Sequence, residues 1–314
     1  MPELIDGQWV IRRSEVATYK RCPHAWYRMY VEGYRHPDVE NPEDNRTQGT
    51  WWHSILQAGL EATIGGPLDA RAGLRYLAAA NGRLEELRET WGQLPPWMDT
   101  STIAEWWTNV AQRYLGEVLF CEQTLYAYPP DTWSLLPGDY WPGLAVQGTI
   151  DYLALDKQGN LLVGEHKTSQ SGGNELSLDV VYAADEQIDC YHMLVRSAMG
   201  QQVVGQRVPY ASLVDVTRKV DPARARVALV TVTQQPRAAT AGALYLAALL
   251  RLVLPNMVRL VQENDPEAAM RIWNPLPWMR CFCPGDLEVA CAAAKRGDDV
   301  VYQLKRMFPM SERK

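Results

Sequence analysis

The feature that most constrains the fold is the segment GTIDYLALDKQGNLLVGEHK, residues 148–167, which has the pattern of a β-hairpin. Apolar residues dominate both halves and are separated by the short polar stretch 157–159. A three-residue hairpin loop favours glycine at its third position, where the backbone is left-handed, and Gly159 stands there. The sequence therefore predicts two antiparallel strands in which Asp156 pairs with Asn160.

This register decides where the charged side chains lie. It sets Asp151 opposite Glu165, with Lys167 on the same face, whereas a two-residue loop would put Asp151 on the other face. Two carboxylates opposite each other on a ladder repel, so a positive group is expected between them. Lys167 alone satisfies that need as part of a surface charge cluster. A divalent cation is the other interpretation, since Mg²⁺ takes one or two carboxylates together with water and phosphate oxygens.

The rest of the chain predicts an α/β protein with a mixed sheet flanked by helices and a helical insertion. Ser14 is expected to cap a first short helix, and the polar segment 34–48 reads as a loop. Helical spacing then runs from about 50 to 120, interrupted by two prolines at 95–96. Further strands are expected at 122–128 and 227–233, and further helices at 178–199 and 238–262.

Bulk composition narrows the class of protein without identifying it. The 314 residues have a formal net charge of −6, which counts mildly against a nucleic-acid partner, although clustered carboxylates and a local basic groove can coexist. The N-terminal segment 1–14 lacks the apolar run of a signal peptide, and the apolar segment 238–260 is interrupted by charges and proline. A cytoplasmic protein without a membrane span is expected, in which six cysteines are metal ligands or thiols.

Several motifs, taken together, resemble those of a known family. G-x-x-D followed by a strand that ends in E-x-K is similar to the signature of the PD-(D/E)XK nuclease superfamily. Two further motifs resemble its RecB-like branch, namely a G-x-x-x-H that ends at His53 and a Q-x-x-x-Y formed by Gln187 and Tyr191. The resemblance implies a restriction-endonuclease-like core within one nuclease domain, 1–314. Its expected parts are a helical region at about 14–120, a catalytic core at about 121–235 and a C-terminal lobe at about 236–314.

The resemblance also implies roles for individual residues. Asp151, Glu165, His53 and the backbone carbonyl of His166 would bind Mg²⁺ or Mn²⁺, and Lys167 would orient the nucleophile or offset developing charge. Gln187 and Tyr191, one helical turn apart, would line the site. Each role has a structural alternative: a salt bridge for Lys167, a structural histidine for His53 and core packing for Tyr191. Some members of the family also place an acidic residue near the position of Glu122.

Four cysteines resemble the ligands of the iron–sulfur nucleases of this branch, which include CRISPR-associated and phage exonucleases. They are Cys22, Cys281, Cys283 and Cys291. The last three form C-x-C-x7-C, which departs from the usual C-x-x-C-x5-C of the family. A 4Fe–4S cluster is the expectation from the resemblance, whereas the spacing alone favours zinc or no metal.

The resemblance implies hydrolysis of phosphodiester bonds in DNA, as an exonuclease acting on single strands or on ends. A non-catalytic nucleic-acid-binding scaffold of the same fold is the first alternative. The second is a processing subunit of a recombination or CRISPR adaptation complex, and either a homo-oligomer or a partner protein would fit that role. The intact set of Asp151, Glu165 and Lys167 favours the enzyme over the scaffold.

Overall fold

A computed structural model of the chain describes residues 3–33, 41–127, 144–170, 185–198, 209–225, 228–236, 249, 253–264 and 268. The chain forms two compact units. The first comprises 1–39, 126–148 and 246–314, and the second comprises 40–125 and 149–245. The expectation of one nuclease domain over the whole chain stays a prediction. Among the described helices, none has the length and apolar character that a bilayer span requires.

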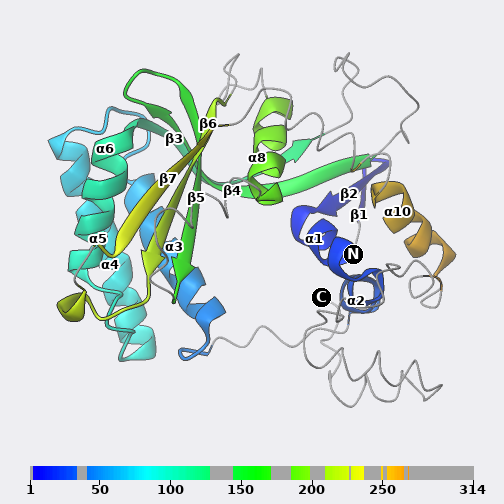
Figure 1. The fold of residues 1–314 in the computed structure, drawn as a ribbon, viewed down its shortest axis with the longest axis horizontal. Coiled ribbons are helices and arrows are strands. Elements are labelled where there is room, and N and C mark those ends of the chain that lie inside the picture. Colours follow the sequence, from blue (N-terminus) through cyan, green and yellow to red (C-terminus); the bar gives the residue numbers. More distant parts are fainter. Residues whose placement is uncertain are drawn as a thin grey trace. The chain divides into compact units, whose positions relative to one another are not determined.

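Seven strands form one mixed sheet (Figure 1) in the order β1-β2-β4-β5-β6-β7, with β3 also paired to β4. The pairs β2–β4 and β5–β6 are parallel, and the pairs β1–β2, β4–β5 and β6–β7 are antiparallel. The strands are β1 (Glu3–Ile5), β2 (Gln8–Arg12), β3 (Leu115–Ala127), β4 (Leu144–Asp156), β5 (Leu161–Ser169), β6 (Ala211–Arg218) and β7 (Val230–Pro236). A mixed α/β fold of the restriction-endonuclease type is therefore confirmed.

The hairpin between β4 and β5 has the register expected from the sequence. Leu155 pairs with Leu161, and the ladder continues to Tyr152 and Gly164. The backbone N–H of Asp156 donates to the carbonyl of Asn160 at 2.8 Å, and Gly159 has φ +82°. The carboxylate of Asp156 closes the turn by accepting from the N–H groups of Gln158 and Asn160, both at 2.8 Å. The three-residue loop is confirmed, and with it the alternation of side chains between the two faces of β4 and β5.

Helices cover both faces of the sheet in the second unit. On one face lie α3 (Asn45–Glu61), α4 (Ala70–Trp91), α5 (Thr100–Trp106), the π-helix η2 (Trp107–Ala111) and α6 (Gln112–Tyr114). Asp44, Asp69 and Asp99 cap α3, α4 and α5 by accepting backbone N–H groups. On the other face α8 (Glu186–Ser197) packs Ile188 against β6. The 3₁₀ turn η3 (Pro222–Arg224) follows β6.

The large core of the second unit explains why the aromatic content is rich in tryptophan. Trp52 and Trp106 are fully buried, and Tyr76 stacks on Trp106 with ring centroids 5.3 Å apart. The same core takes in Leu213 of β6, whereas the alternate residues Val214 and Val216 face α8. The tryptophans at these two positions are therefore core residues.

Two boundaries differ from the expected ones. Strand β3 begins at Leu115, whereas helical structure was expected to continue to about 120. Close to this boundary the two backbones approach each other, since a Cβ on Gly116 would lie 2.6 Å from the carbonyl oxygen of Asp156. The loop at 34–48 ends earlier than expected, because Asp44 starts α3 at Asn45.

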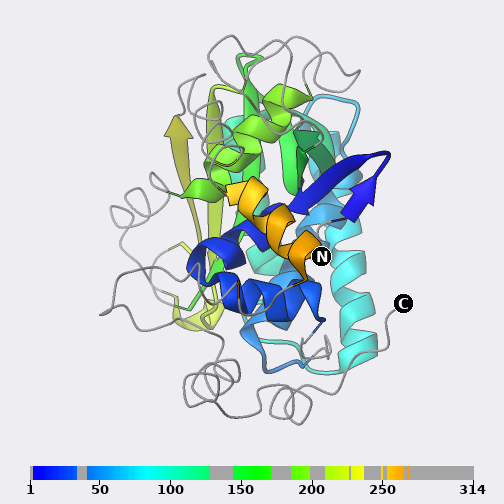
Figure 2. The ribbon, with the colours of Figure 1, turned by 90° about the vertical axis from the view of Figure 1, so that its right-hand side faces the viewer.

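The first unit contains β1, β2, the first residues of β4, α1 (Arg13–Arg21), α2 (Pro23–Trp26), the π-helix η1 (Tyr27–Val31) and α10 (Leu254–Glu263). The expected cap at Ser14 is wrong, since α1 already begins at Arg13 and Ser14 lies in its first turn. Figure 2 shows α10 beside the N-terminal helices, where Tyr27 donates to the side chain of Asn264 at 3.2 Å. The described parts of the expected helices 178–199 and 238–262 are helical as α8 and α10.

Candidate metal centre and its neighbours

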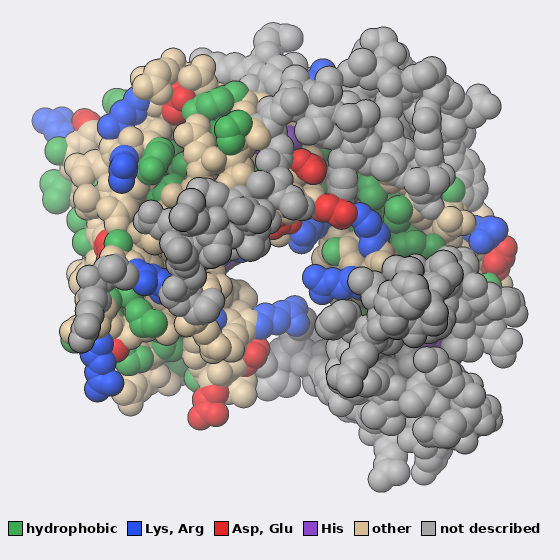
Figure 3. All heavy atoms as spheres, in the orientation of Figure 1, with side chains coloured by type: hydrophobic (Ala, Val, Ile, Leu, Met, Phe, Trp, Pro, Cys, Tyr) green, Lys and Arg blue, Asp and Glu red, His purple; other side chains and the backbone are tan. Residues whose placement is uncertain are grey.

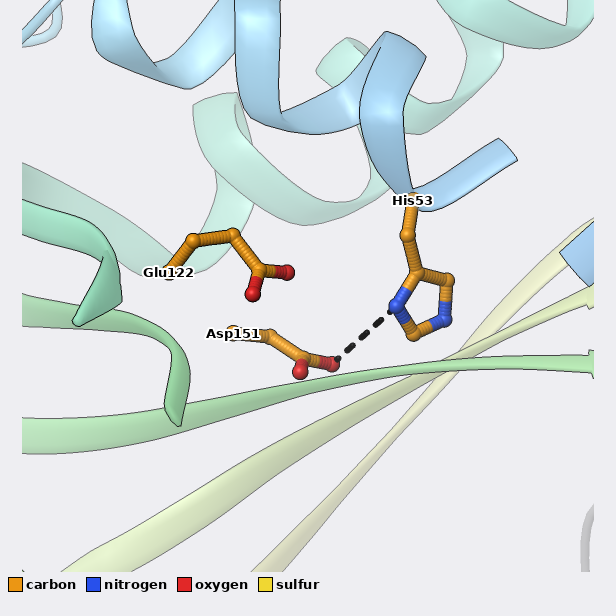
Figure 4. Close-up of side chains that lie close together, drawn as sticks. All are labelled: His53, Glu122 and Asp151. Atoms are coloured by element: carbon orange, nitrogen blue, oxygen red, sulfur yellow. Dashed lines mark ion pairs between the residues drawn. The ribbon is translucent and has the colours of Figure 1, made fainter. Parts of the chain in front are cut away.

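Three side chains that can bind a metal converge in the second unit (Figure 4). His53 comes from α3, Glu122 from β3 and Asp151 from β4. Each offers one ligand atom, and these atoms all lie within 4.8 Å of one another. Nδ1 of His53 is 3.8 Å from Oδ2 of Asp151. One imidazole nitrogen and two carboxylates on three separate elements form a donor set, which Mn²⁺ and Mg²⁺ accept.

The electrostatics of this group suit a cation. Burial, together with the nearby charges of His166 and Lys167, lowers the pKa of His53 to about 3, so its ring is neutral and keeps a lone pair. Burial raises the pKa of Asp151 to about 6 and also raises the pKa of Glu122. Proximity of the two acids adds to the cost of ionising both. A divalent cation relieves this cost, so the residues fit one.

Glu122 adopts an unusual backbone conformation for a strand residue. Its φ is +46°, in the left-handed region that side-chain-bearing residues seldom occupy. It lies within the long strand β3, whose burial pattern loses its alternation around this position. A local departure of this kind turns a side chain away from its regular direction, and here the carboxylate points toward Asp151 (Figure 4).

Another polar group lies beside the cluster of His53, Glu122 and Asp151 and is made by residues of β5 and α8. Lys167 forms an ion pair with Glu165 and donates to Oε1 of Gln187 at 2.9 Å. The amide of Gln187 donates to Glu165 at 2.6 Å and to the hydroxyl of Tyr191 at 2.8 Å. Glu165 and Lys167 share one face of β5, and Gln187 and Tyr191 share one face of α8. Gln187 thus connects the lysine, the glutamate and the tyrosine.

His166 connects the two groups through its backbone. Its N–H donates to Oδ2 of Asp151 at 2.7 Å, and the ring of His53 hydrogen-bonds to its backbone. Its own ring points the other way, into the core beside Tyr152, with centroids 4.9 Å apart. Tyr152 also occupies the space over Gly164, where any Cβ would lie 2.0 Å from the ring. This is consistent with the expectation that His166 acts through its backbone rather than its ring.

The structure brings most of the expected residues together, but in a different grouping. The carboxylate closest to Asp151 in the three-residue cluster is Glu122, which the sequence supported only through the resemblance. The structural alternative for Lys167, an ion pair with Glu165, is also present. The left-handed conformation that places Glu122 has no sequence signal, because glycine or asparagine would be the residue expected there.

The expected cysteine group is only partly visible. Cys281, Cys283 and Cys291 lie outside the described residues. Cys22 is buried in the first unit, where its sulfur accepts the backbone N–H of Ala25 at 3.3 Å at the start of α2. The C-terminal cysteine lobe therefore stays a prediction.

Comparison with known proteins identifies the family. The family model described as the PD-(D/E)XK nuclease superfamily matches residues 13–251, more than half of the chain. The chain belongs to the PD-(D/E)XK nuclease superfamily. Nuclease activity with divalent metals is characteristic of such proteins, and the cluster of His53, Glu122 and Asp151 lies within the matched range.

Two other comparisons add little to the PD-(D/E)XK assignment. No curated protein matches the chain. A solved structure titled "Crystal structure of SSO0001" aligns over 87% of this chain and 82% of its own, with 11% sequence identity and a TM-score of 0.32. A TM-score so low carries no argument.

Proposed function

We propose that the protein is a deoxyribonuclease that depends on a divalent cation, Mg²⁺ or Mn²⁺. The observation that carries the proposal is the convergence of His53, Glu122 and Asp151 from three different elements. An ion pair between Lys167 and Glu165 accounts for the polar group on β5 and α8, but it does not account for the buried Asp151 and the half-buried Glu122 beside a neutral histidine. Ligation of a cation accounts for the two acids and for the neutral histidine.

In this proposal His53, Glu122 and Asp151 hold the cation, with Glu165 and the backbone carbonyl of His166 as further ligands on the adjoining strand. When bound, the cation supplies Lewis-acid polarisation of the scissile phosphodiester and of the attacking water. The backbone N–H of His166 fixes the orientation of the Asp151 carboxylate through its 2.7 Å hydrogen bond. Asp151 is buried, so bulk water competes little for this contact.

Lys167 has the role of orienting the nucleophile or offsetting charge on the phosphate. Its ammonium is held between Glu165 and Gln187, so its position is fixed before the substrate arrives. Gln187 is held in turn by Tyr191, which is largely buried. Gln187 and Tyr191 are therefore positioning residues that act through Lys167 and Glu165.

DNA as the substrate, and exonuclease action on single strands or ends, rest on the resemblance of the motifs to the RecB-like branch. The surface adds no independent support for a nucleic acid, since basic and acidic side chains are interspersed over the described part of the face in Figure 3. The net charge of −6 agrees with that picture. Binding is then expected to depend on the bound cation as well as on the phosphate contacts of individual cationic residues.

The test is a nuclease assay with Mn²⁺ or Mg²⁺ on end-labelled linear single strands, linear duplexes and circular single strands. An exonuclease degrades the linear substrates and leaves the circle intact. Glu165→Ala should lose activity by about a hundredfold or more, because a charged group at the reacting centre is removed. Glu86→Ala is the matched control, since the side chain of Glu86 pairs with Arg83 on the exposed face of α4. Equal activity of wild type and Glu165→Ala would refute the proposal.

The alternatives make different predictions in the same assay. A non-catalytic scaffold would bind DNA with the same affinity in wild type and Glu165→Ala and would cut neither linear nor circular substrate. A processing subunit of a recombination or CRISPR adaptation complex would cut only when its partner protein is added. An integrase or an annealing protein that co-purifies with the chain would identify that partner.

A 4Fe–4S cluster on Cys22, Cys281, Cys283 and Cys291 is a separate part of the proposal. Cys22 is the one of these four that lies among the described residues, and its sulfur is buried and accepts a backbone hydrogen bond. Iron and acid-labile sulfide near four of each per chain, lost in Cys22→Ser, are expected for such a cluster. Stoichiometric zinc without iron would instead assign the four cysteines to a zinc site.

A further inference from the structure

Asp215 lies at the centre of a fully buried polar network beside the candidate metal centre. It stands on β6, directly across the parallel ladder from His166. Its Oδ2 is 2.8 Å from Nδ1 of His166, and its Oδ1 accepts the indole N–H of Trp106 at 2.9 Å. The hydroxyl of Tyr152 lies 3.5 Å from Oδ2. Every oxygen of this buried carboxylate therefore has a donor.

The network fixes the ring of His166 on all sides. Asp215 binds one nitrogen, Tyr152 lies tilted by 30° against the ring with centroids 4.9 Å apart, and Trp106 packs edge-on at 5.5 Å. His53 contacts the ring from a fourth direction, also edge-on at 5.5 Å. Among the described residues Nε2 of His166 has no hydrogen-bond partner, so Asp215 is the anchor of this imidazole.

The backbone of the same residue lies at the candidate metal centre. The N–H of His166 binds Oδ2 of Asp151, and its backbone also hydrogen-bonds to the ring of His53. Two of the three convergent ligands are thus held by one peptide segment. Since a short strand segment is stiff, whatever fixes the side chain of His166 also fixes the N–H and the carbonyl on either side of it.

We propose that Asp215 is a positioning residue for the cation: by anchoring the ring of His166 in the core, it holds the backbone of His166 where it orients Asp151 and His53. The proposal rests on the metal centre of the proposed function and extends it to a residue on the neighbouring strand. Outer contacts of this kind typically alter metal affinity by about 10- to 100-fold when they are removed. A residue that only stabilised the fold would leave the affinity of the folded protein unchanged.

The test measures Mn²⁺ binding in the absence of DNA, by the loss of the electron paramagnetic resonance signal of free Mn²⁺ on titration with the full chain. Asp215→Asn keeps the size of the side chain and an acceptor for Trp106 but weakens the anchor of His166. Its Kd for Mn²⁺ is expected to rise by about 10- to 100-fold. Nuclease activity, where present, should require proportionately more Mn²⁺ and should recover at saturation, which a folding defect would not do.

Ser212→Ala is the matched control, because Ser212 is also buried on β6 and bonds a histidine, His192, at 2.9 Å. It should lower stability and leave the Kd for Mn²⁺ within about twofold of wild type. Where Asp215→Asn does not fold, Trp106→Phe removes one donor to Asp215 and should weaken Mn²⁺ binding by about threefold or more. Unchanged affinity in the folded variant, or an equal loss in Ser212→Ala, would overturn the proposal.

Asp151→Asn separates failure of this proposal from failure of the proposed function. If wild type binds Mn²⁺ and Asp151→Asn does not, the metal centre stands and Asp215 is judged on its own. If Asp151→Asn binds Mn²⁺ as wild type does, the metal centre itself is refuted, and the role of Asp215 with it. Absence of cleavage in a protein that binds Mn²⁺ refutes the nuclease and leaves the positioning role intact.

Discussion

The two polar groups of the candidate site differ in how well they are satisfied without a ligand. In the group of Glu165, Lys167, Gln187 and Tyr191, each member has a charge or hydrogen-bond partner in another. In the group of His53, Glu122 and Asp151, two acids lie near a histidine that is neutral because burial lowers its pKa to about 3. The first group is organised by its own contacts, whereas the second group lacks a positive charge of its own.

This contrast assigns different tasks to the two groups. Buried like charges are costly unless a counter-charge arrives, so the second group is suited to binding a cation. Mutual contacts hold the lysine of the first group in place, so this group is suited to orienting reactants. Variants of His53, Glu122 or Asp151 should therefore change cation affinity. Variants of Lys167, Gln187 or Tyr191 should change the rate at saturating cation.

The largest effect is expected from Asp151→Asn. The amide keeps an oxygen for the N–H of His166 but removes the charge that the cation needs, so the rate should fall by about 10²- to 10³-fold. Titration with Mn²⁺ should also show the binding site lost. The distinction between the two groups would be wrong if the variant bound Mn²⁺ normally and lost only kcat. Asp151 would then behave as a member of the first group.

The next largest effect is a difference in stability that depends on pH in the metal-free protein. Burial raises the pKa of Asp151 to about 6, so its contribution is fully present below about pH 4 and is lost as the pH rises through 6. Asp151→Asn lacks this carboxylate, so its stability relative to that of wild type should be greater at pH 7 than at pH 4 by about 2 kcal/mol. Urea unfolding with a chelator at several pH values measures this difference.

The stability of wild type must be compared with that of Asp151→Asn because the titration of His53 changes stability in the opposite direction. Its lowered pKa stabilises the folded protein above about pH 6.5, and this contribution is lost as the pH falls toward 3. In wild type the two contributions partly cancel, so the curve of wild type alone is uninformative. Addition of Mn²⁺ above pH 6 should restore stability to wild type but not to Asp151→Asn. A stability difference that is constant across pH would contradict the account of Asp151.

A smaller effect is expected from Gln187→Ala in the first group. The change removes hydrogen bonds to Lys167, Glu165 and Tyr191 but leaves the ion pair in place. The kcat should fall by about tenfold, the size expected for lost bonds to charged groups, with the Kd for Mn²⁺ within about twofold of wild type. Gln234→Ala provides the control, since Gln234 is exposed and also donates to a tyrosine hydroxyl, that of Tyr210. Weaker Mn²⁺ binding in Gln187→Ala would show that Gln187 also contributes to cation binding, and the separation of the two groups would be wrong.

The sequence predicted the hairpin and its register because those depend on local chemistry. Gly159 at a left-handed position and the polar turn beside Asp156 determine which residues pair, and the ladder then places Glu165 and Lys167 on one face. The spacing of Gln187 and Tyr191 predicted a shared helix face for the same reason. These parts of the site required only the periodicity of a strand and of a helix.

The parts that the sequence left open depend on contacts between distant segments. At the start of β3, Gly116 passes close to Asp156, which lies forty residues away in the chain. Asp215 meets His166 only through the parallel pairing of β5 with β6, and no spacing in the sequence indicates that pairing. Glu122 joins Asp151 through a backbone conformation that its residue type disfavours.

The smallest expected effect concerns that conformation of Glu122. A residue with a Cβ at φ +46° is strained by about 1 kcal/mol, which glycine would not be. Glu122→Gly should therefore be more stable than Glu122→Ala by about that amount, although both remove the same charge. Thermal unfolding of the two variants with a chelator measures the difference. Both should bind Mn²⁺ more weakly than wild type, which would place Glu122 in the group that requires the cation. Equal stability of the two variants would mean that the backbone of β3 adopts its left-handed turn without cost, and the orientation of this carboxylate would then need no functional explanation.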